Sequence, residues 1–579
     1  MRKRTRRSIA LGLAAAMVLS GCSNGTGTTE SQENNKTKES AAVETTAGET
    51  TADTEDWDPN VNPAGELPLV KDKITLKVAI RSNPQVDDFV DNDFTKWLEE
   101  QTNIHLEFTM LPDKDVDTKI NLMFAAGKDL PDVVITTAIK NDTLYKYALD
   151  GLIIPMDKYI DKYGDNYLKM INDNPELDKA LIAPDGHIYG LPKYNVTLHN
   201  QMKDGKMYLY KPWLDKLGLD IPKTPDELYE VLKAFKTQDP NGNGIADEIP
   251  LAGATTGSCT NPMAALISPY IPFSPQAQNG SVTNGLWNVD GKITATYVTD
   301  EFRQGLEFVN KLISENLLDP VSFTQDQQQL KQLANRDEVI LGGYTHAYAA
   351  VNANDPKLGD YVCVPLLQTD TGKGGFLRDR LIPKGASYVI TSSCQYPEAA
   401  YRLADFLLSK ESGMRNRYGV EGRDWEYVDQ KTTDLIGLDG DPARFEIIKN
   451  VWGENGSVFW RSECLYYNDY ENVYGKGFKP DAFNADKYHH DNTINCVEPY
   501  IVGDLVPVDS LFFTEEERGD YSLVATSINE HVSQQLAAFA TGSRSLSEWD
   551  NFKQELEGLG LEQYLNYIQT AYNRQFGNQ

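Results

Sequence analysis

The sequence predicts an α/β fold built from two domains. The folded part is predicted to open in the order β-α-β-α-β. Two-residue apolar alternation at 74–80 and 104–110 predicts two strands, and helical spacing at 94–98 predicts a helix between them. A helix-like stretch to 126 then leads to the apolar run 131–135, which is the third strand. This order is typical of an open α/β sheet. About 510 residues follow the leader and its linker, which is more than one core normally serves.

The start of the chain predicts export. Five basic residues at 2–7 precede an apolar run at 9–19, which is long enough for a signal-peptide core and too short to span a bilayer. The run ends in Leu-Ser-Gly-Cys, typical of a bacterial lipobox in which Cys22 receives the lipid, palmitate included, after residues 1–21 are removed. The alternative is an ordinary signal peptide with a chance cysteine. Two or more acyl chains would hold the protein on the outer face of the cell membrane.

Residues 22–65 are expected to form the lipidated Cys22 and a disordered tether. From 23 to 62 the chain is mostly Thr, Glu, Ser, Gly, Asn and Ala, and Trp57 is its only aromatic residue. Such a segment cannot bury enough apolar surface to offset the entropy lost on ordering.

Charge and cysteine usage exclude several classes of function. The formal charge is −30, and about −35 without the basic leader, which argues against a nucleic-acid partner. The five cysteines after Cys22 are widely spaced and include no CxxC, so neither a zinc site nor a disulfide framework is indicated. Cys464 and Cys496 either pair or remain buried free thiols.

Further helices and strands follow the opening sheet. Thr224-Pro-Asp-Glu227 predicts a capping box ahead of a helix, and 545–548 (Ser-Leu-Ser-Glu) predicts a second one. Helices are also expected at 301–317 and 397–409, and short buried strands at 339–342 and 386–390. The chain is expected to close on a helical pair.

The loop 239–248 (DPNGNGIADE) has the pattern of a calcium loop, with oxygen donors at alternate positions around Gly244. It is not an EF-hand, since Pro250 stands where a bidentate Glu is needed, and Glu248 is the substitute. Ca²⁺ suits these flexible oxygen donors better than Mg²⁺, and its role would be structural. A metal-free Asn/Gly turn is the alternative. The expected ligands are the side chains of Asp239, Asn241, Asn243, Asp247 and Glu248 and the backbone carbonyl of Ile245.

Several segments, in order and behind a lipobox, resemble one known family. They are 94–100 (FTKWLEE), 122–134, 183–192 (APDGHIYGLP), 207–251, 418–422 (YGVEG) and 541–572. The chain resembles the extracellular solute-binding lipoproteins (family 1) of carbohydrate ABC importers. Within them it is similar to the large subgroup of Gram-positive bacteria that is related to calcium-containing alginate-binding proteins.

This resemblance implies a two-lobe, type II periplasmic-binding-protein-like fold with a hinge and a central ligand cleft. Residues 66–194 plus 385–430 would form lobe 1, and 195–384 plus 431–579 would form lobe 2 with the calcium loop. Chain crossings are expected near Tyr194, near Pro383 and after Glu421. The implied function is capture of an oligosaccharide for ABC importer permease subunits by a lipid-anchored monomer without chemistry. In the alginate-binding relatives the matching loop binds calcium away from the sugar.

Sugar recognition needs flat apolar faces and planar polar groups. Arg81 follows the first strand, where open α/β sheets place ligands. The glycine-broken segment 451–461 does not have a core pattern and carries three further candidates. Each aromatic candidate has lobe core as its alternative. The expected ligand-binding residues are Arg81, Tyr194, Tyr344, Trp452, Trp460 and Arg461.

Three other functions stay open. A surface glycan-cleaving enzyme would need two carboxylates, but no HExxH, GxSxG or Walker A motif is present, and His489-His490 has no convincing metal-ligand frame. A binding protein that reports to a membrane sensor would use the same cleft. A peptide or another solute could occupy the same fold.

Overall fold

The computed structural model describes residues 57–196, 206–257, 259–273, 285–347, 356–452 and 455–577. The leader, Cys22 and most of the expected tether lie outside these residues. Residues 58–579 form one compact unit. Residues 58–65 therefore belong to the folded unit and not to the tether, because Val61 pairs with Val70 and Asn60 hydrogen-bonds Asp72.

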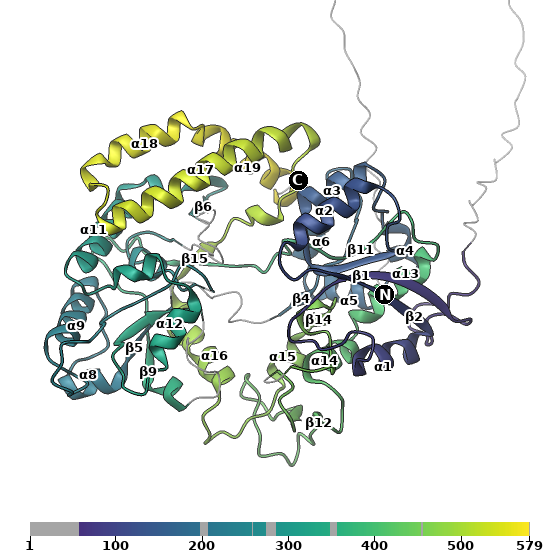
Figure 1. The fold of residues 1–579 in the computed structure, drawn as a ribbon, viewed down its shortest axis with the longest axis horizontal. Helices are drawn as coiled ribbons and strands as arrows, with labels where there is room; N and C mark the ends of the chain where they lie inside the picture. Colours follow the sequence, from purple (N-terminus) through teal and green to yellow (C-terminus); the bar gives the residue numbers. More distant parts are fainter. Residues whose placement is uncertain are drawn as a thin grey trace, which may run out of the picture. The chain divides into compact units, whose positions relative to one another are not determined.

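The opening β-α-β-α-β prediction is confirmed (Figure 1). Strand β1 (Ile74–Arg81) pairs in parallel with β2 (Ile104–Leu111) and with β3 (Val133–Lys140). Helix α1 (Asp93–Thr102) joins β1 to β2, and α2 (Val116–Ala126) joins β2 to β3. The later strand β11 (Gly385–Ile390) adds antiparallel to β3, which gives the order β11-β3-β1-β2. We call this sheet and what packs on it the first lobe.

A second sheet has the order β8-β5-β9 and is antiparallel throughout. Its strands are β5 (Met207–Tyr210), β8 (Gly343–Thr345) and β9 (Tyr361–Val364). The strand expected at 339–342 is thus misplaced: only Leu341 makes an isolated bridge, to Ile249, and the ladder begins at Gly343. We call this sheet and what packs on it the second lobe.

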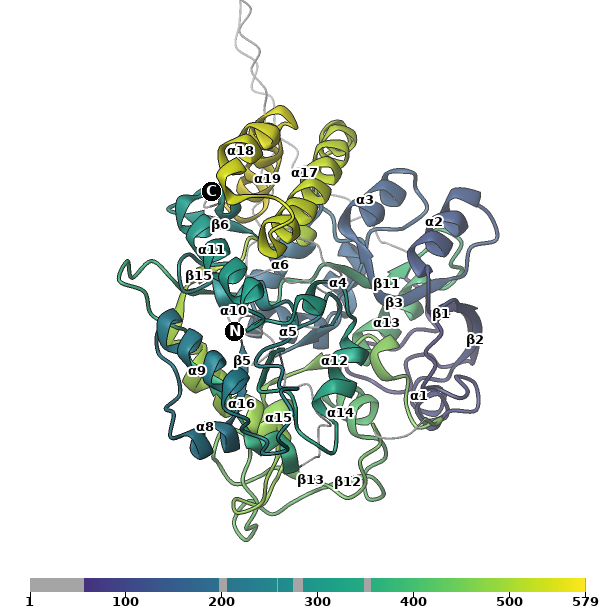
Figure 2. The same ribbon diagram turned by 60° about the vertical axis from the view of Figure 1, so that its left-hand side comes forward.

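Helices supply most of the second lobe's core, and Figure 2 shows α17, α18 and α19 side by side. The closing helices therefore number three, not two. The helices that share this core are α8 (Lys211–Leu217), α9 (Pro225–Thr237), α10 (Pro262–Ile267), α11 (Asp300–Ser314), α17 (Glu515–Thr541), α18 (Trp549–Gly558) and α19 (Leu561–Phe576).

The remaining elements cover the sheets or connect them. The helices are α3 (Asn141–Leu149), α4 (Asp157–Tyr163), α5 (Asn166–Asp173), α6 (Glu176–Leu181), α12 (Gln327–Ala334), α13 (Pro397–Leu407), α14 (Lys410–Tyr418), α15 (Tyr470–Tyr474) and α16 (Ala485–Cys496). The strands form the pairs β4 (Tyr194–Asn195) with β14 (Tyr467–Asn468), β6 (Leu286–Val289) with β7 (Lys292–Ala295), β10 (Phe376–Arg378) with β15 (Ile501–Asp504), and β12 (Trp425–Tyr427) with β13 (Phe445–Ile447).

The two predicted capping boxes differ from the observed caps. Thr224 does cap α9 by accepting the Glu227 N–H, but the Glu227 carboxylate accepts the N–H of Lys223, so the reciprocal bond is absent. Ser545 caps a short 3₁₀ turn by accepting the Ser547 N–H, and α18 begins afterwards at Trp549. The motif residues thus order the approach to each helix.

Residues 425–474, mostly assigned to lobe 2 from the sequence, pack on the first lobe. β14 pairs with β4, α14 contacts β14, and the Trp460 ring lies against Phe94 and Phe108. The chain reaches the second lobe only at α16, which contacts β9. The third crossing therefore falls after Tyr474, because the apolar side chains of this long segment find their partners in the first lobe.

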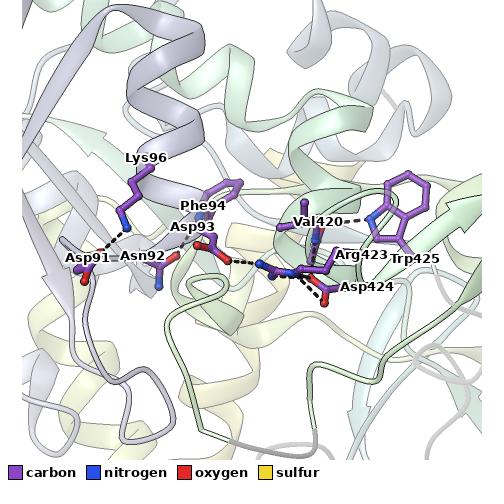
Figure 3. Close-up of polar contacts among 10 residues, drawn as sticks. Asp91, Asn92, Asp93, Phe94, Lys96, Val420, Arg423, Asp424 and Trp425 are labelled. Carbon is purple, nitrogen blue, oxygen red and sulfur yellow. Dashed lines mark hydrogen bonds and ion pairs between the residues drawn. The ribbon is translucent and has the colours of Figure 1, made fainter.

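Arg423 links the turn after α14 to the start of α1 (Figure 3). Its guanidinium lies 2.8 Å from an Asp93 oxygen and 2.7 Å from an Asp424 oxygen. The buried Asp424 carboxylate also accepts the Val420 N–H at 2.8 Å. In the same view, Lys96 pairs with the exposed Asp91.

Among the described residues, no helix is long and apolar enough to cross a membrane. The cysteines after Cys22 are free thiols, and Cys464 and Cys496 are both buried, so these two do not pair.

Candidate functional site

Arg81 ends β1 at the carboxyl edge of the parallel strands, where open α/β sheets bind ligands. Its guanidinium lies 2.7 Å from Asp113 Oδ1 and 3.6 Å from Glu463 Oε1. Asn83 Nδ2 donates to the same Glu463 oxygen at 3.3 Å. A residue from the far end of the chain therefore completes the edge of the first sheet.

Glu463 lies on a 3₁₀ turn (Arg461–Glu463) and is fully buried. Lys193 Nζ donates to the Ser462 carbonyl at 3.0 Å, next to it. Burial raises the pKa of Glu463, while the charges of Arg81 and Lys193 act in the opposite direction. Burial also lowers the pKa of Lys193. We call Arg81, Asn83, Asp113, Lys193 and Glu463 the sheet-edge cluster.

The sheet-edge cluster is balanced in charge, with two cations and two carboxylates. It offers guanidinium, ammonium and amide donors next to carboxylate acceptors, and Glu463 Oε2 has no hydrogen-bond partner among the described residues. Groups of this kind hydrogen-bond hydroxyls of a polar neutral ligand.

Two of the candidates from the segment 451–461, Trp452 and Arg461, lie beside this edge. Arg461 Nε donates to the carbonyl of Gln85, in the loop that follows β1, at 3.2 Å. The Arg461 guanidinium lies 5.5 Å from the Trp452 ring centroid and 5.0 Å from that of Phe459, within cation–π range. Trp452 is 42% exposed, so part of its ring is available to a ligand.

Trp460 is not available to a ligand, and our expectation that 451–461 lies outside the core is wrong for this residue. Its side chain is fully buried. The ring packs edge-on against Phe94 and Phe108, and Nε1 donates to Thr95 Oγ1 at 2.8 Å.

Tyr344 is also core, because it lies within β8 and packs on Tyr208 and Tyr361 at centroid distances of 5.5 and 4.8 Å. Tyr194 is largely buried and stacks on Tyr467 at 6.4 Å. Tyr194 nevertheless lines a cavity of about 200 Å³.

Sequence reasoning missed the charged lining of this Tyr194 cavity. Arg378 pairs with Asp504 at 2.9 Å, and Arg380 pairs with Glu176. It also missed Lys193 and Glu463, although each lies within two residues of a chosen candidate. Of the six expected ligand residues, Arg81, Trp452 and Arg461 lie at or beside the sheet edge. Tyr194 follows Lys193, whose ammonium bonds the Ser462 carbonyl, and its strand β4 pairs with β14. Trp460 and Tyr344 are core, and Tyr344 belongs to the other lobe.

The loop 239–248 is ordered by its own side chains. The Asp239 carboxylate accepts the N–H groups of Gly242 and Gly244 at 3.0 and 3.1 Å. Asn241 Oδ1 accepts the Asn243 N–H, and Asn243 Oδ1 accepts the Ile245 N–H, at 3.0 and 2.7 Å. These bonds fix the turns of the loop.

The residues of this loop fit a cation. Glu248 is buried, and its Oε1 has no hydrogen-bond partner among the described residues. Burial raises the pKa of Glu248, and the charges of Asp239 and Asp247 raise it further. No three His, Cys, Asp or Glu side chains in the described part of the chain converge as a metal site. Amide and backbone oxygens would therefore have to complete the ligand set.

Comparison with known proteins finds relatives along most of the chain. The family described as bacterial extracellular solute-binding protein matches residues 83–414. The fructooligosaccharide ABC transporter substrate-binding protein FusA of Streptococcus pneumoniae is 28% identical over 536 residues, which is 88% of this chain and 92% of that protein. The polygalacturonan/rhamnogalacturonan-binding protein YtcQ of Bacillus subtilis is 29% identical over 464 residues, 74% of this chain and 84% of that protein. Lipoprotein LipO of B. subtilis is 27% identical over 357 residues, which is 59% of this chain and 65% of that protein.

Solved structures agree. FusA from S. pneumoniae in complex with kestose has a TM-score of 0.70 at 24% identity, covering 87% of this chain and 100% of that one. An HMO-binding solute-binding protein from Bifidobacterium longum infantis has a TM-score of 0.71 at 24% identity with the same coverage. The alginate-binding protein AlgQ2 has a TM-score of 0.61 at 21% identity, and the match covers 87% of this chain and 99% of that one. The expected two-lobe α/β fold is confirmed.

Proposed function

The chain belongs to the bacterial extracellular solute-binding protein family, and from this we propose that it is the substrate-binding subunit of an ABC importer for an oligosaccharide. The observation that carries the proposal is the likeness, over nearly the whole chain, to a fructooligosaccharide-binding subunit of such an importer. A second relative binds polygalacturonan and rhamnogalacturonan by its name. We propose that the ligand is captured by lobe closure on a monomer, without chemistry.

The site geometry supports this ligand class. The sheet-edge cluster carries donors and acceptors for sugar hydroxyls, and the exposed Trp452 ring beside it offers a flat apolar face. Each cation of the cluster lies close to a carboxylate, so the site does not offer an excess of positive charge. Between neutral and acidic oligosaccharides we therefore propose a neutral one.

Thermal unfolding of the Cys22→Ala protein with a panel of neutral and acidic oligosaccharides tests the proposal. A ligand at a hundredfold excess over Kd that binds only the native state stabilises it by about 2.7 kcal/mol. A shift with a neutral glycan, recovered intact, supports the proposal. A shift with acidic glycans alone refutes the neutral ligand class, and no shift with any glycan refutes an oligosaccharide ligand. A degraded glycan supports the enzyme alternative.

We propose further that Cys22 carries the lipid anchor and that the folded unit stands on the outer face of the cell membrane. The support is the lipobox, together with the likeness to a protein named as a lipoprotein. Fatty-acid labelling that Cys22→Ala abolishes, with release of the protein into the medium, is the expected result. Labelling that persists in the variant refutes the anchor.

The loop 239–248 is proposed to hold a structural Ca²⁺ through Asp239, Asn241, Asn243, Asp247, Glu248 and the Ile245 carbonyl. When bound, the ion would neutralise the buried Glu248 and fix the connection from α9 to Ile249. The loop is no part of the sheet-edge cluster, so its role is stability.

Delivery of the ligand to a membrane sensor is the second candidate function, because ligand capture by lobe closure serves an importer and a sensor equally. Loss of uptake on deleting the gene supports the importer. Loss of gene induction with intact uptake supports the sensor.

A further inference from the structure

Two cysteines that are remote in the sequence meet in the second lobe. Cys363 lies in β9 and Cys496 is the last residue of α16. The Cys496 thiol donates to the Cys363 carbonyl oxygen at 3.5 Å, so the two residues are in direct contact. The Tyr488 hydroxyl donates to the Tyr361 carbonyl and joins the same helix to the same strand. The approach therefore follows from how α16 packs on β9.

The pair is enclosed by apolar and aromatic side chains. Both cysteines are buried in one cluster with Tyr208, Tyr344 and Leu358. The other cysteine that the sequence offered as a partner, Cys464, instead donates its thiol to the adjacent Leu465 carbonyl at 3.0 Å. The packing of the helix on the strand holds the two cysteines next to each other in the native state, and a disulfide requires such proximity.

A buried ammonium lies beside the pair. Lys206 Nζ donates to Thr493 Oγ1, on α16, at 2.7 Å. A hydrogen bond from Cys363 and the Lys206 charge together lower the pKa of Cys496. Burial raises the pKa of Cys363, against the charge of Lys206. Cys496 is thus the thiol that loses its proton more readily, and a thiolate is the nucleophile in disulfide exchange.

We propose that Cys363 and Cys496 form an intramolecular disulfide by exchange with a low-molecular-weight disulfide, covalently joining α16 to β9. The Cys496 thiolate attacks one sulfur of RSSR and displaces RS⁻, which gives a mixed disulfide. The Cys363 thiolate then attacks the Cys496 sulfur and displaces the second RS⁻. Two protein thiols are oxidised, one RSSR is reduced to two RSH, and the two thiol protons end on the released RSH.

The bond would stabilise the second lobe and leave the ligand site unchanged. It closes a long loop between positions 363 and 496 and so restricts the unfolded chain more than the native one. Both residues lie away from the sheet-edge cluster, which belongs to the first lobe. The inference is independent of the proposed transport role.

Peptide mapping tests the bond directly. The full chain carrying Cys22→Ala is refolded from urea with oxidised glutathione, blocked with N-ethylmaleimide and digested without reductant. A linked peptide pair containing Cys363 and Cys496 is expected, with a Tm several degrees above the reduced protein that dithiothreitol reverses. Unlinked Cys363 and Cys496, a Cys464–Cys496 pair, or glutathione retained on Cys496 would each overturn the proposal.

Variants separate the bond from folding defects. Cys363→Ala and Cys496→Ala are each expected to remove the linked pair and the redox dependence of Tm. Cys464→Ala, an equally buried thiol, is the matched control and is expected to keep both. Since the map of the parent chain does not depend on any variant folding, the proposal stays testable if one of them fails to fold.

Discussion

Trp452 and Trp460 lie eight positions apart and are expected to respond in opposite ways to the same substitution. Trp460→Ala removes a fully buried indole from a cluster with Phe94 and Phe108 at 5.1 and 5.5 Å. Truncating a buried Trp typically destabilises by about 3–5 kcal/mol. For a lobe of this size, that corresponds to a fall in Tm on the order of 10 °C.

Trp452→Ala removes a ring that is 42% exposed. Its Nε1 bond to the Arg417 carbonyl, 2.7 Å long, and its contact with Arg461 contribute about 1 kcal/mol together, so Tm is expected to change by only a few degrees. If the exposed face stacks on a sugar ring, the loss of about 1.4 kcal/mol of binding raises Kd roughly tenfold.

Differential scanning calorimetry and isothermal titration with the identified glycan measure both effects. The reasoning fails if Trp460→Ala melts within about 2 °C of the parent, or if it loses affinity while keeping its Tm. It also fails if Trp452→Ala binds as tightly as the parent, since the exposed ring would then have no part in the site.

Three further predictions concern stability. Burial lowers the pKa of His489 from about 6.5 to about 4, so between these pH values the native state binds fewer protons than the unfolded state. The free energy of unfolding should therefore fall by up to about 3 kcal/mol as the pH drops through this window. Melting curves of His489→Gln should show a smaller fall with pH, and a fall equal to that of the parent protein would contradict the prediction. Asp239→Ala should lower Tm and remove the response to Ca²⁺ and chelator, with ligand affinity nearly unchanged; a parent protein whose Tm ignores chelator would rule out the metal. Arg423→Met leaves the buried Asp424 without its cation and should destabilise the protein by about 1–2 kcal/mol in urea titrations. Lys96→Met loses an exposed ion pair and should show no measurable change in stability. Equal effects of the two substitutions would contradict the argument from burial.

Features with short-range causes could be predicted from the sequence. The two-residue apolar period at 74–80 and 104–110 reports directly which side of a strand is buried, and β1 and β2 lie there. The turn at 239–248 also follows from neighbours, because Asp239 and Asn241 bond to N–H groups two to five residues away. The position of Arg81 at the sheet edge was predicted by the same logic, since the end of β1 fixes where its last residue lies.

Burial of the aromatic candidates was decided by tertiary contacts. Trp452 and Trp460 share a glycine-broken segment, and local composition does not distinguish them. The difference arises because Phe94, from α1, and Phe108, from β2, enclose one ring, and no neighbouring residue in the sequence marks that enclosure.

The sequence by itself determined the α/β order of the first lobe and the family resemblance, and it predicted an export signal and a cation loop, since each depends on residues close together in the chain. Only the tertiary structure brought Glu463 to Arg81, joined residues 425–474 to the first lobe, and set Cys496 against Cys363 in place of Cys464. The physical reason is that such contacts join segments more than a hundred residues apart, and their free energy depends on how whole elements pack.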